Sequence, residues 1–193
     1  MTKLEILIVE DNEKNRKTAQ RYFNTIKNVD VDFAVYYENG LRKIREGLYG
    51  VGIFDLELPK NKKINKLEKL GLGLAIEATE YAIPWAVITA GFFRHENSNG
   101  CFVTYSWNEI PDINEIKSEL KDRKELDLLG KFGFKFICLE KTDPNVWGKV
   151  YQEIIKNTPN IYEITEARKR YKKYAGKPYQ LDPKLMKYLI TYL

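Results

Sequence analysis

Four short apolar runs, each ending in residues with charged or hydroxyl side chains, constrain the fold of this chain most. The runs and their polar residues are ILIVEDN with Glu10 and Asp11, VGIFDLELP with Asp55, AVITAG with Thr89, and FKFICLEK with Lys141. Runs of β-branched and aromatic residues this short are typical of buried parallel strands. The carboxyl ends of parallel strands share one edge of an open α/β sheet. We therefore expect three acids, one hydroxyl and one lysine to meet at that edge.

The three acids, Glu10, Asp11 and Asp55, need a cation if they lie together. Two carboxylates held within about 5 Å of each other repel by roughly 3 kcal/mol at an effective dielectric constant near 20. Mg²⁺ suits such a cluster because it prefers hard oxygen ligands and retains part of its water shell. The sequence therefore predicts Mg²⁺ as the cofactor.

Taken in chain order, these residues resemble the receiver domain of two-component response regulators. Glu10 and Asp11 stand where that family keeps its metal-binding acidic pair. Asp55, in the motif Asp-Leu-Glu-Leu-Pro, stands at the phosphoacceptor position. Thr89 corresponds to the switch hydroxyl and Lys141 to the invariant lysine. The set of motifs in this order is more specific than any one of them alone.

The resemblance implies an α/β, flavodoxin-like (βα)5 sandwich of three layers with a central five-stranded parallel sheet. It implies that Asp55 accepts a phosphoryl group from a histidine kinase or a histidine phosphotransfer protein, with Mg²⁺ held by the three acids and the main-chain carbonyl of Glu57. Lys141 and Thr89 would stabilise the phosphoryl oxygens. Such a chain is an autocatalytic phosphoacceptor rather than a turnover enzyme, and it signals through contact with a downstream protein or a second copy.

The chain is longer than this fold requires, which predicts two additions. We expect a receiver domain at 1–157 with an insertion at about 92–112, between strands four and five, and a helical extension at 158–193. The insertion contains a strand-like segment, 101–107, and the lysine-rich stretch 60–66 predicts an enlarged loop over Asp55. Expected strands are 4–9, 31–37, 51–54, 85–89 and 134–139. Expected helices are 14–26, 41–46, one that starts with 71–78, 113–129, 145–156, 161–174 and 184–192.

Three departures from the family pattern leave other functions open. Cys138 stands where many receivers have an aromatic residue, Thr142 stands where proline is common, and the loop after Pro59 is long. These features suit a pseudo-receiver that acts as a scaffold without phosphorylation. Glu57 formally occupies the place of the second catalytic acid of a phosphatase with a related fold. Asp55 read alone could simply cap a turn.

Composition limits the partners that we expect. The net charge of +5 is spread along the 193 residues, which favours solubility more than nucleic-acid binding. A basic run with tyrosines at 168–174 is more often the solvated face of a helix, and the tail is short for a complete DNA-binding domain, so DNA binding is not expected. Because no apolar stretch reaches the roughly 18 residues of a membrane span, we expect a cytoplasmic protein.

Overall fold

A six-stranded sheet forms the centre of the molecule. The computed structural model describes residues 3–89, 103–106, 135–138, 141, 143–158 and 160–176. The strands in spatial order are β2 (Val29–Ala34), β1 (Leu4–Val9), β3 (Val51–Asp55), β6 (Trp85–Thr89), β8 (Lys135–Cys138) and β7 (Val103–Ser106). The first five are parallel, and β7 pairs with β8 antiparallel. The predicted five-stranded parallel sheet is therefore present, with an additional antiparallel strand at one edge.

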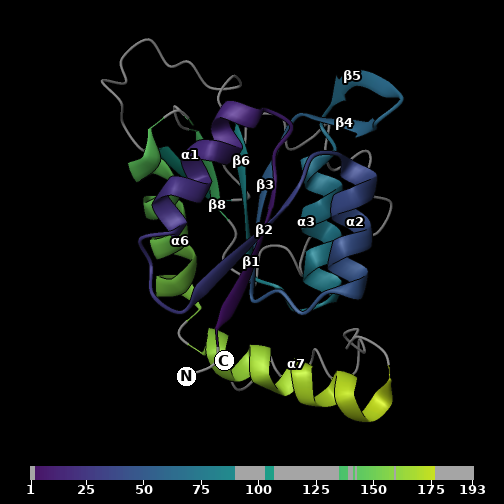
Figure 1. Cartoon of the computed structure of the whole chain (residues 1–193), viewed down its shortest axis with the longest axis vertical. Helices are drawn as coiled ribbons and strands as arrows, with labels where there is room; N and C mark the ends of the chain where they lie inside the picture. The colour runs from purple at the N-terminus through teal and green to yellow at the C-terminus, as the bar shows by residue number, and fades with distance from the viewer. Residues whose placement is uncertain are drawn as a thin grey trace.

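Helices cover both faces of this sheet and make the three layers (Figure 1). On one face lie α1 (Glu13–Phe23) and α6 (Pro144–Asn157), and on the other lie α2 (Tyr37–Glu46) and α3 (Gly71–Glu80). Leu7 and Val9 belong to the core under α2 and α3, whereas Ile6 and Ile8 belong to the core under α1 and α6. Successive strand residues point to opposite faces, so a strand that is covered on both sides is apolar throughout.

Polar side chains begin the two helices next to the predicted site. Asn12 is the N-cap of α1, where its side-chain oxygen accepts hydrogen bonds from the main-chain N–H groups of Lys14 and Asn15. Asp143 caps α6 in the same way, and Pro144 follows in the first turn. These residue types satisfy N–H groups that have no partner within a helix.

The lysine-rich stretch after Asp55 differs from the prediction of an enlarged loop. It forms an antiparallel hairpin of β4 (Leu58–Asn61) and β5 (Ile64–Glu68). Leu58 is fully buried and fixes the first strand. The side-chain oxygen of Asn61 accepts a hydrogen bond from the Lys63 main-chain N–H at 3.0 Å, which closes the turn. Local side-chain bonding of this kind builds a tight turn from a polar sequence that otherwise resembles a loop.

The predicted strand in the insertion is confirmed, since β7 lies within 101–107. The remainder of the 92–112 insertion, the expected helix at 113–129 and the expected helix at 184–192 lie outside the described residues. Among the helices that the structure describes, none is long and apolar enough to cross a membrane.

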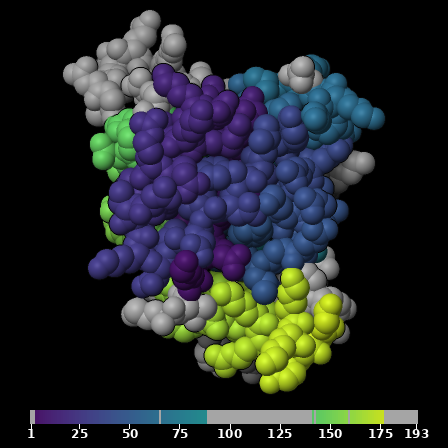
Figure 2. Space-filling view, viewed as in Figure 1, coloured from purple at the N-terminus to yellow at the C-terminus, as the bar shows by residue number. Residues whose placement is uncertain are grey.

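The C-terminal helix α7 (Ile161–Ala175) lies across the end of the sheet where β1 begins (Figures 1 and 2). Ile161 belongs to the core, and Arg168 is only 4% exposed. Arg168 Nη1 donates to the main-chain oxygen of Tyr49 at 2.7 Å, and Lys172 Nζ donates to that of Glu46 at 2.6 Å. The interpretation of the basic run as a solvated face is therefore wrong for Arg168, which anchors α7 to the domain.

Replacing Arg168 with alanine is expected to lower the free energy of unfolding by about 2 to 4 kcal/mol. The change leaves a cavity and removes the donor to the Tyr49 carbonyl. Urea unfolding measures the loss. The matched control is Arg170→Ala on the same helix, because Arg170 is exposed and its loss should stay within about 0.5 kcal/mol. Equal effects of the two changes would contradict the anchoring role of Arg168.

Candidate functional site

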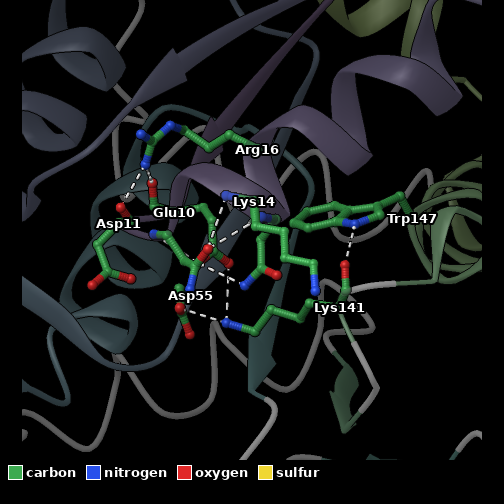
Figure 3. Close-up of polar contacts among 9 residues, drawn as sticks. Glu10, Asp11, Lys14, Arg16, Asp55, Lys141 and Trp147 are labelled. Atoms are coloured by element: carbon green, nitrogen blue, oxygen red, sulfur yellow. Dashed lines mark hydrogen bonds and ion pairs between the residues drawn. The ribbon is translucent and has the colours of Figure 1, made fainter.

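Three carboxylates meet at the carboxyl ends of β1 and β3, as predicted (Figure 3). Glu10 and Asp11 directly follow β1, and Asp55 is the last residue of β3. Each offers one carboxylate oxygen, and these three oxygens lie within 4.8 Å of one another. Glu10 and Asp55 are buried, with 1% and 8% of their surface exposed.

Lys141 lies far from the three acids in the sequence but contacts two of their carboxylates in the fold. Its Nζ lies 3.0 Å from Glu10 Oε2 and 2.5 Å from Asp55 Oδ2, and the side chain is 4% exposed. The main-chain oxygen of Lys141 accepts a hydrogen bond from Trp147 Nε1 at 3.1 Å. Because Trp147 is buried in α6, this bond fixes the backbone that carries the lysine.

Glu10 is engaged by protein donors on both carboxylate oxygens. Its Oε1 accepts from the Asn12 main-chain N–H at 3.2 Å and from Asn15 Nδ2 at 3.1 Å, while Oε2 faces Lys141. Glu10 is thus held in place as an acceptor within the protein. Asp11 and Asp55 are consequently the carboxylates better placed to bind a cation.

Arg16 holds the acidic turn and was not singled out from the sequence. Its Nη1 donates to the main-chain oxygens of Glu10 at 2.7 Å and Asp11 at 2.6 Å (Figure 3). Arg16 is the fourth residue of α1, and this place at the start of the helix is the sequence signal that could have indicated a contact with the residues just before it.

The other predicted site residues lie on the surrounding elements. Thr89 ends β6, the strand next to β3, and its backbone pairs with Cys138 at the end of β8. The side chains of Thr89 and Cys138, and the whole of Thr142, lie outside the described residues. Glu57 is two residues beyond Asp55, and its side chain is exposed.

Negative charge is in excess at the cluster. Burial raises the pKa of the Asp55 carboxyl to about 7; repulsion from Glu10 adds to the shift and Lys141 opposes it. Burial and then Glu10 also raise the pKa of Asp11. At separations near 4.8 Å each pair of ionised carboxylates repels by about 3 to 4 kcal/mol at an effective dielectric constant near 20. One lysine does not balance three carboxylates, so the oxygen donors and their surplus charge fit Mg²⁺.

Gly71 lies against the backbone of the site. Its N–H donates to the Leu56 main-chain oxygen at 3.0 Å, and a Cβ at Gly71 would lie 2.0 Å from the main-chain oxygen of Asp55. Only glycine therefore allows α3 to begin so close to the end of β3.

Replacing Gly71 with alanine is expected to destabilise the protein by about 2 kcal/mol or more and to weaken divalent-cation binding, because backbone must move. Chemical denaturation and Mg²⁺ titration measure the two effects. Gly73→Ala in the same helix is the control, since its Cβ would meet only the end of the Tyr37 side chain at 3.0 Å. A Gly71→Ala protein as stable as the control would contradict this account.

Comparison with known proteins places the fold. A scan of family models finds no match, and no curated protein matches the sequence. Solved structures do match. A fusion protein containing the yeast Spc42 trimeric coiled coil aligns at 17% identity and a TM-score of 0.51, covering 98% of this chain and 94% of its own. A CheY-like response regulator receiver domain from Methanospirillum hungatei JF-1 aligns at 14% identity and a TM-score of 0.50, covering 82% of this chain and 99% of its own.

The chain has the receiver-domain fold. Counted along the sequence, the five parallel strands lie in the order 2-1-3-4-5, which is the flavodoxin-like order. In open sheets of that order, ligands bind outside the carboxyl ends of the strands, which is where Asp55 lies here. The hairpin β4–β5 and strand β7 are additions to the predicted five-stranded arrangement.

Proposed function

We propose that this chain is a response regulator receiver that accepts a phosphoryl group on Asp55 with the help of Mg²⁺. The observation that carries the proposal is the burial of Asp55 beside Glu10 and Asp11, with Lys141 Nζ 2.5 Å from its carboxylate. A buried cluster of like charges costs stability, and perturbed acids of this kind are typical of functional sites. A scaffold that is never phosphorylated would bear this loss of stability with no functional benefit.

The chemical step is the attack of an Asp55 carboxylate oxygen on the phosphorus of the donor. A new O–P bond forms as the bond from phosphorus to the donor's imidazole nitrogen breaks, and the electron pair stays on that nitrogen. The product is an acyl phosphate on Asp55. With a small acyl phosphate as donor, the leaving group is a carboxylate.

Each of the surrounding residues has a role in this proposal. Asp11, Asp55 and the main-chain carbonyl of Glu57 would hold Mg²⁺. Glu10 would lie beside them in the same cluster, with its carboxylate oxygens accepting hydrogen bonds from protein donors. When bound, the ion supplies positive charge to the phosphoryl oxygens. Lys141 Nζ lies beside Asp55 Oδ2, and from there it would neutralise one of the phosphoryl oxygens. We assign the hydrogen bond of the switch hydroxyl to Thr89.

The partners follow from the chemistry. The donor would be a histidine kinase or a histidine phosphotransfer protein, which would place the chain in the cytoplasm with that donor. Phosphorylation adds a charge of about −1.5 to −2, which shifts the population between two surface arrangements. A downstream protein or a second copy of the chain would bind the surface arrangement that phosphorylation favours.

We also propose the division of the chain into a receiver domain at 1–157 and a helical extension at 158–193.

Intact-protein mass spectrometry tests the proposal after incubation with Mg²⁺ and acetyl phosphate. The wild type should gain one phosphoryl group, and Asp55→Asn should gain none. Asp30→Asn is the control, because Asp30 is an exposed carboxylate at the opposite end of the sheet, paired with Lys3. Failure of the wild type to gain mass from any phosphodonor would support the scaffold function instead.

A further inference from the structure

The hairpin between β3 and α3 carries a concentrated positive charge. We call residues 57–69 the basic hairpin; this segment contains five lysines and two glutamates. The exposed lysines are Lys60, Lys62, Lys63 and Lys66. Among the described residues, Lys66 lies 3.9 Å from Glu68, whereas the first three have no carboxylate at ion-pair distance. The surface therefore has positive charge available for an acidic partner.

Two large aliphatic side chains accompany these lysines. Ile64 is 41% exposed and Leu67 is 49% exposed, both on β5. β5 pairs only with β4 in the described part of the chain. A two-stranded hairpin of this length is marginally stable by itself. This one is held from the β4 side, where Leu58 is buried and Asn61 Nδ2 donates to Glu38 Oε1 at 3.0 Å. β5 is therefore the outer strand of a hairpin that is anchored to the domain through β4.

The basic hairpin borders the proposed phosphorylation site. β4 begins three residues after Asp55. A hydrogen bond from the Gly71 main-chain N–H to the Leu56 main-chain oxygen joins the two ends of the segment that contains the hairpin. Figure 1 shows the hairpin at the end of the sheet where β3 ends, and Figure 2 shows it projecting at the edge of the molecule. A protein that brings a phosphohistidine to Asp55 would cover the rim of the site next to this surface.

We infer that the basic hairpin is the docking surface for an acidic face of the histidine-bearing phosphodonor protein; this rests on the proposed function. Exposed lysines accelerate encounter with an oppositely charged surface in a salt-dependent manner. Ile64 and Leu67 supply the apolar contacts that hold a complex once it has formed. A nucleic acid fits less well, because its phosphates would meet the adjacent carboxylates and gain nothing from the aliphatic side chains.

Phosphotransfer from purified histidine kinases and phosphotransfer proteins of the same genome tests the inference, with acetyl phosphate as a donor that needs no docking. The triple change Lys60→Glu, Lys62→Glu, Lys63→Glu should slow transfer from the protein donor by about tenfold or more, most strongly at low salt. A second variant, Ile64→Ser with Leu67→Ser, should slow transfer with little salt dependence. Uptake from acetyl phosphate should stay within about threefold at 0.15 M salt, because the site itself is unchanged.

The control is Arg170→Glu with Lys173→Glu, an exposed basic pair on α7 at the other end of the molecule, which should leave both rates unchanged. Unchanged transfer from the protein donor in both hairpin variants would overturn the inference. Uptake from acetyl phosphate without transfer from any protein donor would also overturn it and leave the proposed function standing. A DNA duplex that binds the wild type but not the triple variant, while transfer is unchanged, would assign the surface to nucleic acid. A wild type that takes phosphoryl from neither source would overturn both proposals.

Discussion

Replacing Lys141 with methionine is expected to lower the free energy of unfolding of the metal-free protein by about 3 to 5 kcal/mol at pH 8. The change leaves Glu10 and Asp55 buried without the cation that lies 3.0 and 2.5 Å from their oxygens. The loss should be smaller at pH 6, because Asp55 can then take up a proton. Urea unfolding at the two pH values measures the effect.

Mg²⁺ should bind more tightly to Lys141→Met than to the wild type. The cluster gains one unit of negative charge, and the lysine no longer contacts Asp55. Saturating Mg²⁺ should therefore restore much of the lost stability by mass action. Lys3→Met is the control, because the exposed pair of Lys3 with Asp30 should contribute less than about 1 kcal/mol. Equal losses for Lys141→Met and Lys3→Met would contradict the bridging role of Lys141.

Replacing Asp55 with asparagine is expected to stabilise the metal-free protein above neutral pH. The pKa of Asp55 is raised in the folded protein from 3.8 to about 7, chiefly by burial. A raised carboxyl pKa gives stability that is complete below pH 3.8 and is lost as the pH rises through 7. Asp55→Asn lacks this term, so its stability relative to the wild type should increase by more than about 1 kcal/mol between pH 5 and pH 8.

Parallel urea unfolding curves from pH 5 to pH 8 measure this difference, and Asp30→Asn serves as the exposed control that should follow the wild type. Mg²⁺ should reverse the order at pH 8, because the wild type binds it more tightly than Asp55→Asn does. A constant difference across this pH range would show that Asp55 ionises as an ordinary exposed carboxyl.

Sequence patterns located the strands best where apolar runs end abruptly. Leu4–Val9 and Trp85–Thr89 were predicted to the residue. The second strand was predicted at 31–37 but ends at Ala34, because the alternation of apolar residues continues beyond it. The second helix was predicted at 41–46, yet α2 begins at Tyr37 and Gly40 lies inside it. A Cβ there would come within 2.8 Å of Val9, so close packing of α2 on β1 outweighs turn propensity.

The acids and the lysine of the site could be predicted because one rule of sheet topology brings the carboxyl ends of strands together. Arg16 and Trp147 could not, since both act on main-chain oxygens, whose positions follow only from the folded backbone. The hairpin was missed for a similar reason. Its turn depends on one side-chain bond of Asn61, and its first strand on the burial of Leu58.

Anomalous diffraction from crystals soaked in Mn²⁺, a stand-in for Mg²⁺, tests the central claim most directly. The account predicts one strong peak in contact with carboxylate oxygens of both Asp11 and Asp55, and loss of that peak in Asp55→Asn. A Mn²⁺-saturated crystal with no peak at these two carboxylates would contradict the assignment of the cluster as a metal-dependent phosphorylation site.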